Sequence, residues 1–278
     1  MTFPTPEFRQ RSASAAMMTA CLLFAQAAAA ETAPGCRFEA LGNGRAVAVT
    51  DGRSFRLADG RDIRLAGIDV PQDAGGNAAA LASRAALENL LLGKDVVLTA
   101  DSDTPDRYGR ISAFAFVNGS ETPVQYNLLA GGQARVSAQM QDNARSLARS
   151  LACSLALFGE EKKARETRIG LWGDPGYAVR AANDGPAIRP QRGRFSVVEG
   201  RVVSVRDSGA TIYVNFGRRW SEALTVTILK RNQPSFVAAG IEPRMLEGRT
   251  IRIRGYVDVR NGPVIEATRP QQIEIAAR

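Results

Sequence analysis

Apolar residues alternate with polar ones in short runs along the chain, and the runs fall into two groups with the same order. The first group occupies residues 37–50, 54–57, 63–68, 96–100 and 111–117. Such alternation is typical of strands with one buried face. Residues 78–92, after a capping Asn77, instead show a helical pattern between the third and fourth runs. Three strands, a helix and two strands are the order of an OB-type five-stranded barrel.

Two helices are predicted after this barrel, at residues 124–129 and 143–168. In the longer helix an apolar stripe recurs at helical spacing and predicts a face packed on the barrel. The stripe consists of Ala144, Leu147, Leu151, Leu155 and Phe158. The next residues are charged and predict a solvent-facing surface: Glu161, Lys162, Lys163 and Arg165. Gly170 is expected to end the helix.

Residues 174–194 are rich in proline and glycine and predict a linker. The same order of elements then returns. Strands are expected at 195–205, 211–216, 224–229, 250–259 and 264–275, with a short helix at 234–240. The predicted fold is therefore mixed α+β and mainly β: an OB-type barrel with packed helices at 31–173, followed by a second small OB-like barrel at 195–278.

The first thirty residues have the pattern of a secretory signal peptide. Arg9 and Arg11 precede an apolar, alanine-rich run at residues 13–30, which ends in Ala28-Ala29-Ala30. We expect a secreted or periplasmic protein without stable membrane insertion after cleavage. A lipoprotein attached through Cys21 is a weaker alternative.

The chain contains no histidine, which excludes histidine-based triads and histidine zinc sites. Cleavage of the signal peptide leaves two cysteines, Cys36 and Cys153. In an oxidising compartment we expect a disulfide between them; two separate buried thiols are the alternative.

Positive charge is concentrated near the C-terminus. The net charge is +8, and residues 191–278 hold 15 basic against 8 acidic residues, with 14 of the basic residues being arginine. Arginine binds phosphate in a bidentate geometry that lysine does not offer. This distribution indicates a polyanionic partner such as DNA or RNA.

Three short motifs point to one family. They are Asp51-Gly52-Arg53-Ser54, the run from Arg64 through Gly67-Ile68-Asp69 to Pro71-Gln72, and Asp106-Arg107-Tyr108-Gly109-Arg110. Together with Gly170-Leu171-Trp172 they resemble the staphylococcal nuclease (thermonuclease-like) family over residues 37–173.

The resemblance implies site residues by position. In that family two aspartates hold calcium, a glutamate activates water and two arginines neutralise the phosphate. The arginines match Arg64 and Arg110, and one calcium ligand matches Asp69. The second ligand position is Arg53, and the general-base position is Gln72, whose amide cannot accept a proton at neutral pH. We therefore expect no cofactor, and phosphate binding rather than phosphate cutting.

A rearranged site is the alternative. Asp51 could join Asp69 around a weakly held calcium ion, and a one-residue loop shift could bring Asp73 near the water. The chain would then be an active secreted endonuclease that cleaves DNA or RNA.

In the second predicted barrel, alternation along residues 251–260 places basic and aromatic side chains on the outward face. We expect a nucleic-acid-binding face there, although an ordinary solvated face is equally compatible with the pattern. Its residues are Arg252, Arg254, Tyr256 and Arg260, joined by Tyr213 of the neighbouring run and Trp220 of a nearby loop.

Three functions remain open at this point. The leading one is binding of nucleic acid or another polyanion with weak or lost phosphodiesterase activity. The others are the active calcium-dependent nuclease and a structural periplasmic module that binds acidic proteins. The sequence does not determine the oligomeric state.

Overall fold

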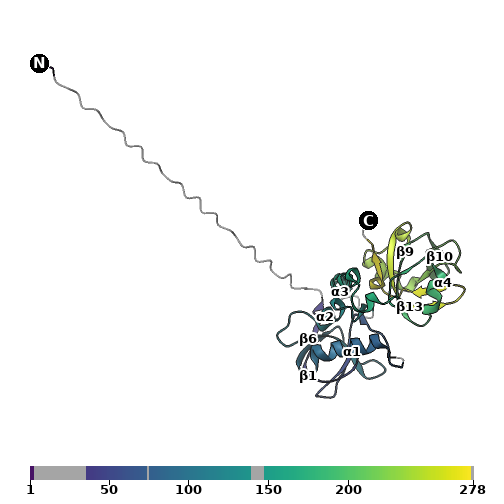
Figure 1. Cartoon of the computed structure of the whole chain (residues 1–278). Helices are drawn as coiled ribbons and strands as arrows, with labels where there is room; N and C mark the ends of the chain where they lie inside the picture. Colours follow the sequence, from purple (N-terminus) through teal and green to yellow (C-terminus); the bar gives the residue numbers. More distant parts are fainter. Residues whose placement is uncertain (3–35, 74, 139–146, 277–278) are drawn as a thin grey trace. The chain divides into compact units, whose positions relative to one another are not determined.

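The computed structural model describes residues 1–2, 36–73, 75–138 and 147–276. Residues 32–278 form one compact unit (Figure 1). Nearly all of the predicted signal peptide lies outside the described residues. Within the described ranges, every helix is too short or too polar to cross a membrane.

Five strands of the N-terminal half close into a ring in the order β1-β2-β3-β6-β5. They are β1 (Glu39–Asp51), β2 (Ser54–Leu57), β3 (Asp62–Leu65), β5 (Asp95–Ala100) and β6 (Arg110–Val117). The pair β3–β6 is parallel and the other pairs are antiparallel. Buried Phe55, Ile63 and Phe114 belong to the core of this first sheet. The predicted order of elements is confirmed.

Helix α1 (Ala78–Leu91) connects the third strand of the ring to the fourth. The predicted cap is confirmed, because Asn77 Oδ1 accepts a hydrogen bond from the Ala79 amide at 3.0 Å. A break at Ala66-Gly67 separates β3 from the short strand β4 (Ile68–Asp69), which pairs with β7 (Arg135–Val136). The strand expected at residues 63–68 is thus two strands in two different sheets.

Helix α2 (Val124–Ala130) packs against α3 (Leu147–Thr167), and a 3-10 turn at Gly170–Gly173 follows. The predicted stripe on α3 is wrong in part. Leu155 is 69% exposed, whereas the small or polar residues Ser150, Ser154 and Glu161 are buried. The helix is rotated because Cys153 and Glu161 both have partners on the packed side. Residues 143–146 of the expected helix lie outside the described residues.

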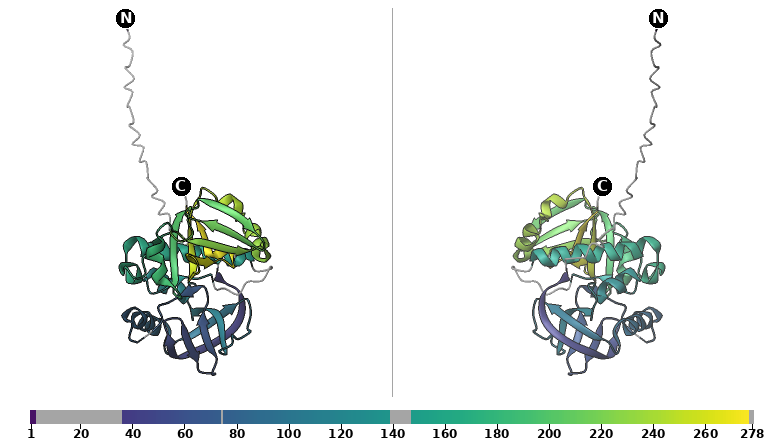
Figure 2. Two further views of the ribbon diagram at one scale, coloured as in Figure 1. Left: turned by 90° about the vertical axis from the view of Figure 1, so that its right-hand side faces the viewer. Right: turned by 90° about the vertical axis from the view of Figure 1, so that its left-hand side faces the viewer.

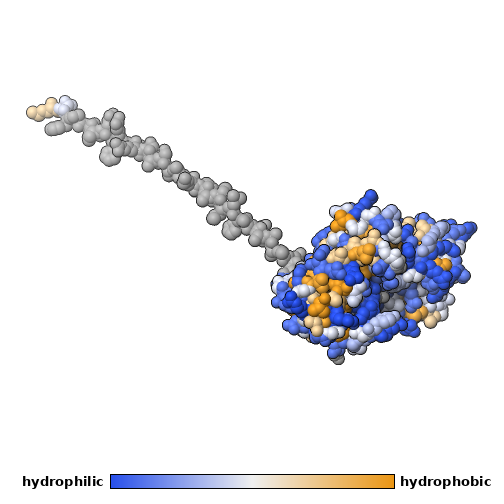
Figure 3. Space-filling view, turned by 60° about the horizontal axis from the view of Figure 1, so that its bottom comes forward, coloured by the Kyte–Doolittle hydropathy of each residue, from blue (hydrophilic) through white to orange (hydrophobic). Residues whose placement is uncertain are grey.

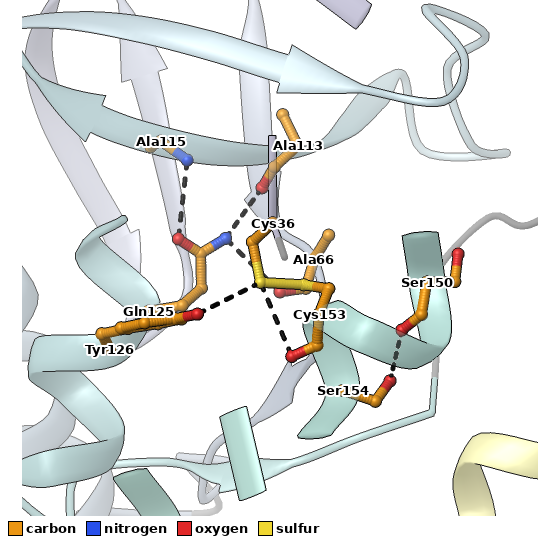
Figure 4. Close-up of a disulfide and its surroundings, with 9 residues drawn as sticks. All are labelled: Cys36, Ala66, Ala113, Ala115, Gln125, Tyr126, Ser150, Cys153 and Ser154. Atoms are coloured by element: carbon orange, nitrogen blue, oxygen red, sulfur yellow. Dashed lines mark hydrogen bonds between the residues drawn. A yellow bond between two sulfur atoms is a disulfide. The ribbon is translucent and has the colours of Figure 1, made fainter. Parts of the chain in front are cut away.

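The predicted disulfide between Cys36 and Cys153 is confirmed, and it ties the chain just before β1 to α3 (Figure 4). The Tyr126 hydroxyl lies 3.7 Å from Cys36 Sγ. Burial, with a smaller contribution from Glu160, raises the pKa of Tyr126 to about 12.

Residues 174–194, the predicted linker, carry short elements of their own. These are β8 (Arg180–Ala181), α4 (Gly185–Ile188) and a 3-10 turn at Arg189–Gln191. Ala182 and Ile188 are fully buried in the core of the second sheet. This stretch therefore packs against the strands that follow it.

The second sheet has the order β10-β11-β12-β14-β13-β9-β8, with β15 paired to β13. Its strands are β9 (Phe195–Arg201), β10 (Ser204–Ser208), β11 (Thr211–Asn215), β12 (Thr225–Leu229), β13 (Thr250–Val259), β14 (Pro263–Glu266) and β15 (Ile273–Ile275). Helix α5 (Gln233–Ala238) lies between β12 and β13 in sequence. Strands β9 and β10 follow one another with only Val202 and Val203 between them. Taken as one bent strand, they give the pairing order of the first sheet, including a parallel third and fifth strand.

Helix α3 and the turn after it share buried contacts with the second sheet. Ala164 of α3, Trp172 after it, and Phe195 and Val197 of β9 form a separate apolar cluster. Figure 2 shows α3, in teal, beside the strands of the second sheet. On the face of the compact unit shown in Figure 3, hydrophilic and apolar side chains are interspersed, as is usual for folded proteins.

Candidate functional site

Asp69, at the end of β4, lies between two arginines. Arg53 Nη1 is 3.3 Å from Asp69 Oδ1, and Arg135 Nη2 is 3.1 Å from Oδ2. The Tyr256 hydroxyl, from the second sheet, donates to Oδ1 at 3.4 Å. The Asp69 side chain is only 5% exposed. Both carboxylate oxygens therefore already have donors.

The local backbone places these arginines. The Arg53 amide donates to Asp51 Oδ1 at 2.8 Å, which closes the turn between β1 and β2, and Arg53 Nη1 donates to the Ile68 carbonyl at 3.1 Å. Arg135 is directly opposite Asp69 in the antiparallel pair β4–β7. Opposite charges at such facing positions stabilise a pair of strands.

These residues do not fit a calcium ion. Calcium takes six to eight oxygen ligands, mostly carboxylates and carbonyls. Here a buried guanidinium stands at the second ligand position, and Asp51 is engaged by the Arg53 amide. Among the described residues, no three acidic, cysteine or histidine side chains gather closely enough to hold a metal.

Arg64, on β3, is a half-buried cation that makes no hydrogen bond or ion pair with any described residue. Burial lowers the pKa of its guanidinium, and the positive charges of Arg53 and Arg110 lower it further. Asp51 and Tyr256 act in the opposite direction with smaller effect. Because arginine stays protonated in proteins, Arg64 presents a positive charge that no described carboxylate pairs with.

Arg110 is close enough to influence Arg64, but it already has a partner. Its Nη2 and Nε donate to Asp106 Oδ2 at 2.8 and 3.0 Å. The guanidinium also lies over the Tyr108 ring, 4.8 Å from its centroid. An anion at Arg64 would have to compete with Asp106 for Arg110.

A cavity of about 610 Å³ opens beside Arg64. Arg53, Arg64 and Ser112 line it from the first sheet, and Tyr256 and Thr268 line it from the second. This size lies in the range of pockets that hold small ligands, about 300–1,000 Å³. The cavity, hereafter the Arg64 pocket, is thus built by both sheets.

Gln72 and Asp73 lie elsewhere. Gln72 is exposed and lines a separate cavity of about 430 Å³ together with Asp69, Arg135 and Tyr177. The Asp73 carboxylate is exposed and accepts a hydrogen bond from the Gly76 amide at 2.9 Å. The structure does not bring Asp51, Asp69 and Asp73 together as a metal site.

The expectation that Arg252 and Arg254 present an open binding face is wrong. Arg254 is fully buried: it donates to Glu161 Oε2 on α3 at 2.7 Å and to Glu274 Oε2 at 2.9 Å. Arg252 pairs with Glu199 and with Glu274. Both side chains do point away from the core of the second sheet, but α3 and neighbouring carboxylates cover that face.

The other predicted binding residues of the second sheet separate into two places. Tyr256 lines the Arg64 pocket. Tyr213, Trp220 and Arg260 line a smaller cavity of about 170 Å³.

Sequence reasoning missed Arg135 and the buried role of Glu161. Arg135 lies on a two-residue strand, which is too short to show alternation. Glu161 accepts from the Val136 amide at 2.9 Å as well as from Arg254, although Lys162 and Lys163, which follow it, are exposed charges. Neither role leaves a signal in the local sequence.

Comparison with protein-family models gives a match that covers part of the chain. Residues 62–174 match the model of the staphylococcal nuclease homologue family. Residues 62–174 are a staphylococcal nuclease homologue domain. The match includes Arg64, Asp69, Gln72 and Arg110 and begins after Arg53, so the substituted turn lies outside it.

Comparison with curated proteins gives an uncharacterized protein of Methanocaldococcus jannaschii. It is 32% identical over 92 residues, which are 31% of this chain and 38% of the relative. The chain thus matches well under half of the relative's length. The similarity says nothing about activity, because the relative is itself uncharacterized.

Proposed function

We propose that this protein is exported and binds nucleic acid or another phosphate-bearing polyanion in the Arg64 pocket, with weak or lost phosphodiesterase activity. The observation that carries the proposal is the half-buried Arg64 guanidinium, which has no hydrogen-bond or ion-pair partner in the part of the chain that the structure describes. A partly desolvated cation without a partner is costly, and a phosphate oxygen would relieve that cost.

The neighbours of Arg64 favour binding over cleavage. The positive charges of Arg53 and Arg110 act on Arg64 more strongly than the negative charge of Asp51, so the local field favours an anion and opposes a dication. Gln72 supplies no general base, and loss of such a base costs roughly 10²–10⁴ in rate. The nuclease homologue domain would then hold a phosphodiester without activating water against it.

The remainder of the proposal concerns export and fold type. The disulfide between Cys36 and Cys153 supports an oxidising compartment, because such bonds are rare in the cytosol. The shared pairing order supports an OB-type assignment for both sheets. OB-type barrels commonly bind oligonucleotides.

The test measures binding of a fluorescent single-stranded oligonucleotide to wild type and to Arg64→Ala across a series of salt concentrations. We expect Arg64→Ala to weaken binding about tenfold and to reduce the salt slope by about one, because one phosphate contact is lost.

Arg45→Ala is the matched control, since Arg45 lies on β1 in an exposed pair with Asp95. It should bind like wild type. Equal binding by Arg64→Ala and wild type would overturn the proposal.

A further inference from the structure

A third cavity, away from the Arg64 pocket, is formed by strands β11, β12 and β14 and by two loops. Its volume is about 170 Å³, which is small for a whole ligand and suits a single planar group. Tyr213 of β11 and Trp220 of the β11–β12 loop form one part of it, and Arg260 to Gly262 of the β13–β14 turn form another.

The aromatic rings in this cavity are aligned. The Tyr213 and Trp220 rings are nearly parallel, with an interplanar angle of 7° and centroids 6.2 Å apart. Trp220 is 53% exposed, although a tryptophan side chain gains much from burial. Two parallel aromatic rings, one exposed and one partly buried, border this cavity, and nucleobases stack on such rings.

The two loops are held together before any ligand arrives. A Cβ atom on Gly262 would clash with the Trp220 carbonyl oxygen, so only glycine permits this approach. Arg189 Nη2 donates to the carbonyls of Ser221 and Asn261, at 3.1 and 3.4 Å, and so joins the loops. The backbone at Trp220 is therefore held in place by the fold.

The side chain of Arg260, which borders the cavity, is held by an exposed ion pair. Arg260 pairs with Asp258 at 3.3 Å, with side chains 65% and 52% exposed. Exposed pairs of this kind contribute little, so a phosphate can replace Asp258 as the partner of Arg260. Residues 191–278 also carry the excess of arginine noted above.

We infer that Tyr213, Trp220 and Arg260 form a second binding site, which takes an unpaired base of a single-stranded nucleic acid and its adjacent phosphate. The base stacks on the aromatic pair, and Arg260 binds the phosphate. This site is separate from the Arg64 pocket.

The test uses the fluorescence of Trp220, since the other tryptophan, Trp172, is only 6% exposed. Oligothymidylate and oligouridylate should quench it, and the same sugar-phosphate chain without bases should not. By polarization, Trp220→Ala and Tyr213→Ala should each weaken oligothymidylate binding about tenfold, whereas Trp220→Phe should retain most of the affinity.

Met245→Ala is the control, because Met245 is 70% exposed on the same half of the molecule and lines none of these cavities. If the Trp220 and Tyr213 variants melt at the same temperature as Met245→Ala, they are folded, and a loss of affinity reflects the lost side chain. Arg64→Ala should leave the quenching in place, which separates this site from the proposed function. Quenching by the base-free chain, quenching by a neutral oligosaccharide instead, or unchanged affinity of Trp220→Ala would each overturn the inference.

Discussion

At the scale of single residues, the sequence indicates which residues form the candidate site but not which side chains they contact. Arg64, Asp69 and Arg110 could be located from their order along the chain, as could the substitutions Arg53 and Gln72. Their partners could not. Asp69 is held by Arg135, which is 66 residues away. Only the pairing of β4 with β7 brings these two side chains together.

The environment of Asp69 predicts the cost of removing its charge. Asp69→Asn leaves Arg53 and Arg135 buried without a counter-charge, and we expect it to lower the free energy of unfolding by about 3 kcal/mol. Urea denaturation measures this. Asp95→Asn is the control, because its pair with Arg45 is exposed and should contribute less than about 1 kcal/mol. The contrary result is an Asp69→Asn protein that is as stable as Asp95→Asn when calcium is absent. Asp69 would then be a ligand of an empty calcium site and not the counter-charge of the two arginines.

At the scale of elements, alternation and turn residues predict most strands and the helix α1, because each strand buries one face in its own sheet. Helix α3 shows the limit of this reasoning. Its most regular apolar stripe includes exposed Leu155, and its buried side includes Ser150 and Glu161. A disulfide and a buried carboxylate determine the rotation of this helix, and hydrophobic periodicity reports neither.

The disulfide predicts a measurable dependence on redox state. Replacing Cys36 and Cys153 by alanine opens a link across a sequence separation of 117 residues and should lower the free energy of unfolding by roughly 4–5 kcal/mol in the chain-entropy model. Thermal or urea unfolding with and without reductant measures this. Reductant should lower the free energy of unfolding of the wild type to that of the double variant, and it should not change the variant. A wild type that is insensitive to reductant and as stable as the variant would contradict the prediction.

At the scale of the whole molecule, the second sheet completes the site of the first. Alternation along β13 correctly indicates that Arg252, Arg254 and Tyr256 point away from their own core, but it does not indicate what lies opposite. Arg254 meets Glu161 of α3, and Tyr256 meets Asp69. The sequence predicted an open binding face there; in the structure Arg254 makes a buried contact instead, whereas Tyr256 stays 42% exposed.

The contact between Glu161 and Arg254 predicts energetic coupling between helix α3 and the second sheet. Glu161→Leu or Arg254→Leu alone leaves a buried charge without this partner and should cost about 3 kcal/mol, whereas the double variant should cost clearly less than the sum. Urea unfolding of the four proteins gives the coupling energy. The exposed pair Arg244–Asp207 provides a control cycle with little coupling. Additive effects at Glu161 and Arg254 would contradict the prediction.

The central claim is that this nuclease homologue domain binds phosphodiesters without cutting them, and a single assay tests it most directly. End-labelled single-stranded DNA or RNA is incubated with the purified protein, in calcium and in chelator, and both the bound and the cleaved fractions are measured. We expect the strand to be bound and intact to the same extent in both conditions. Cleavage that requires calcium and disappears in Asp69→Ala would contradict the account.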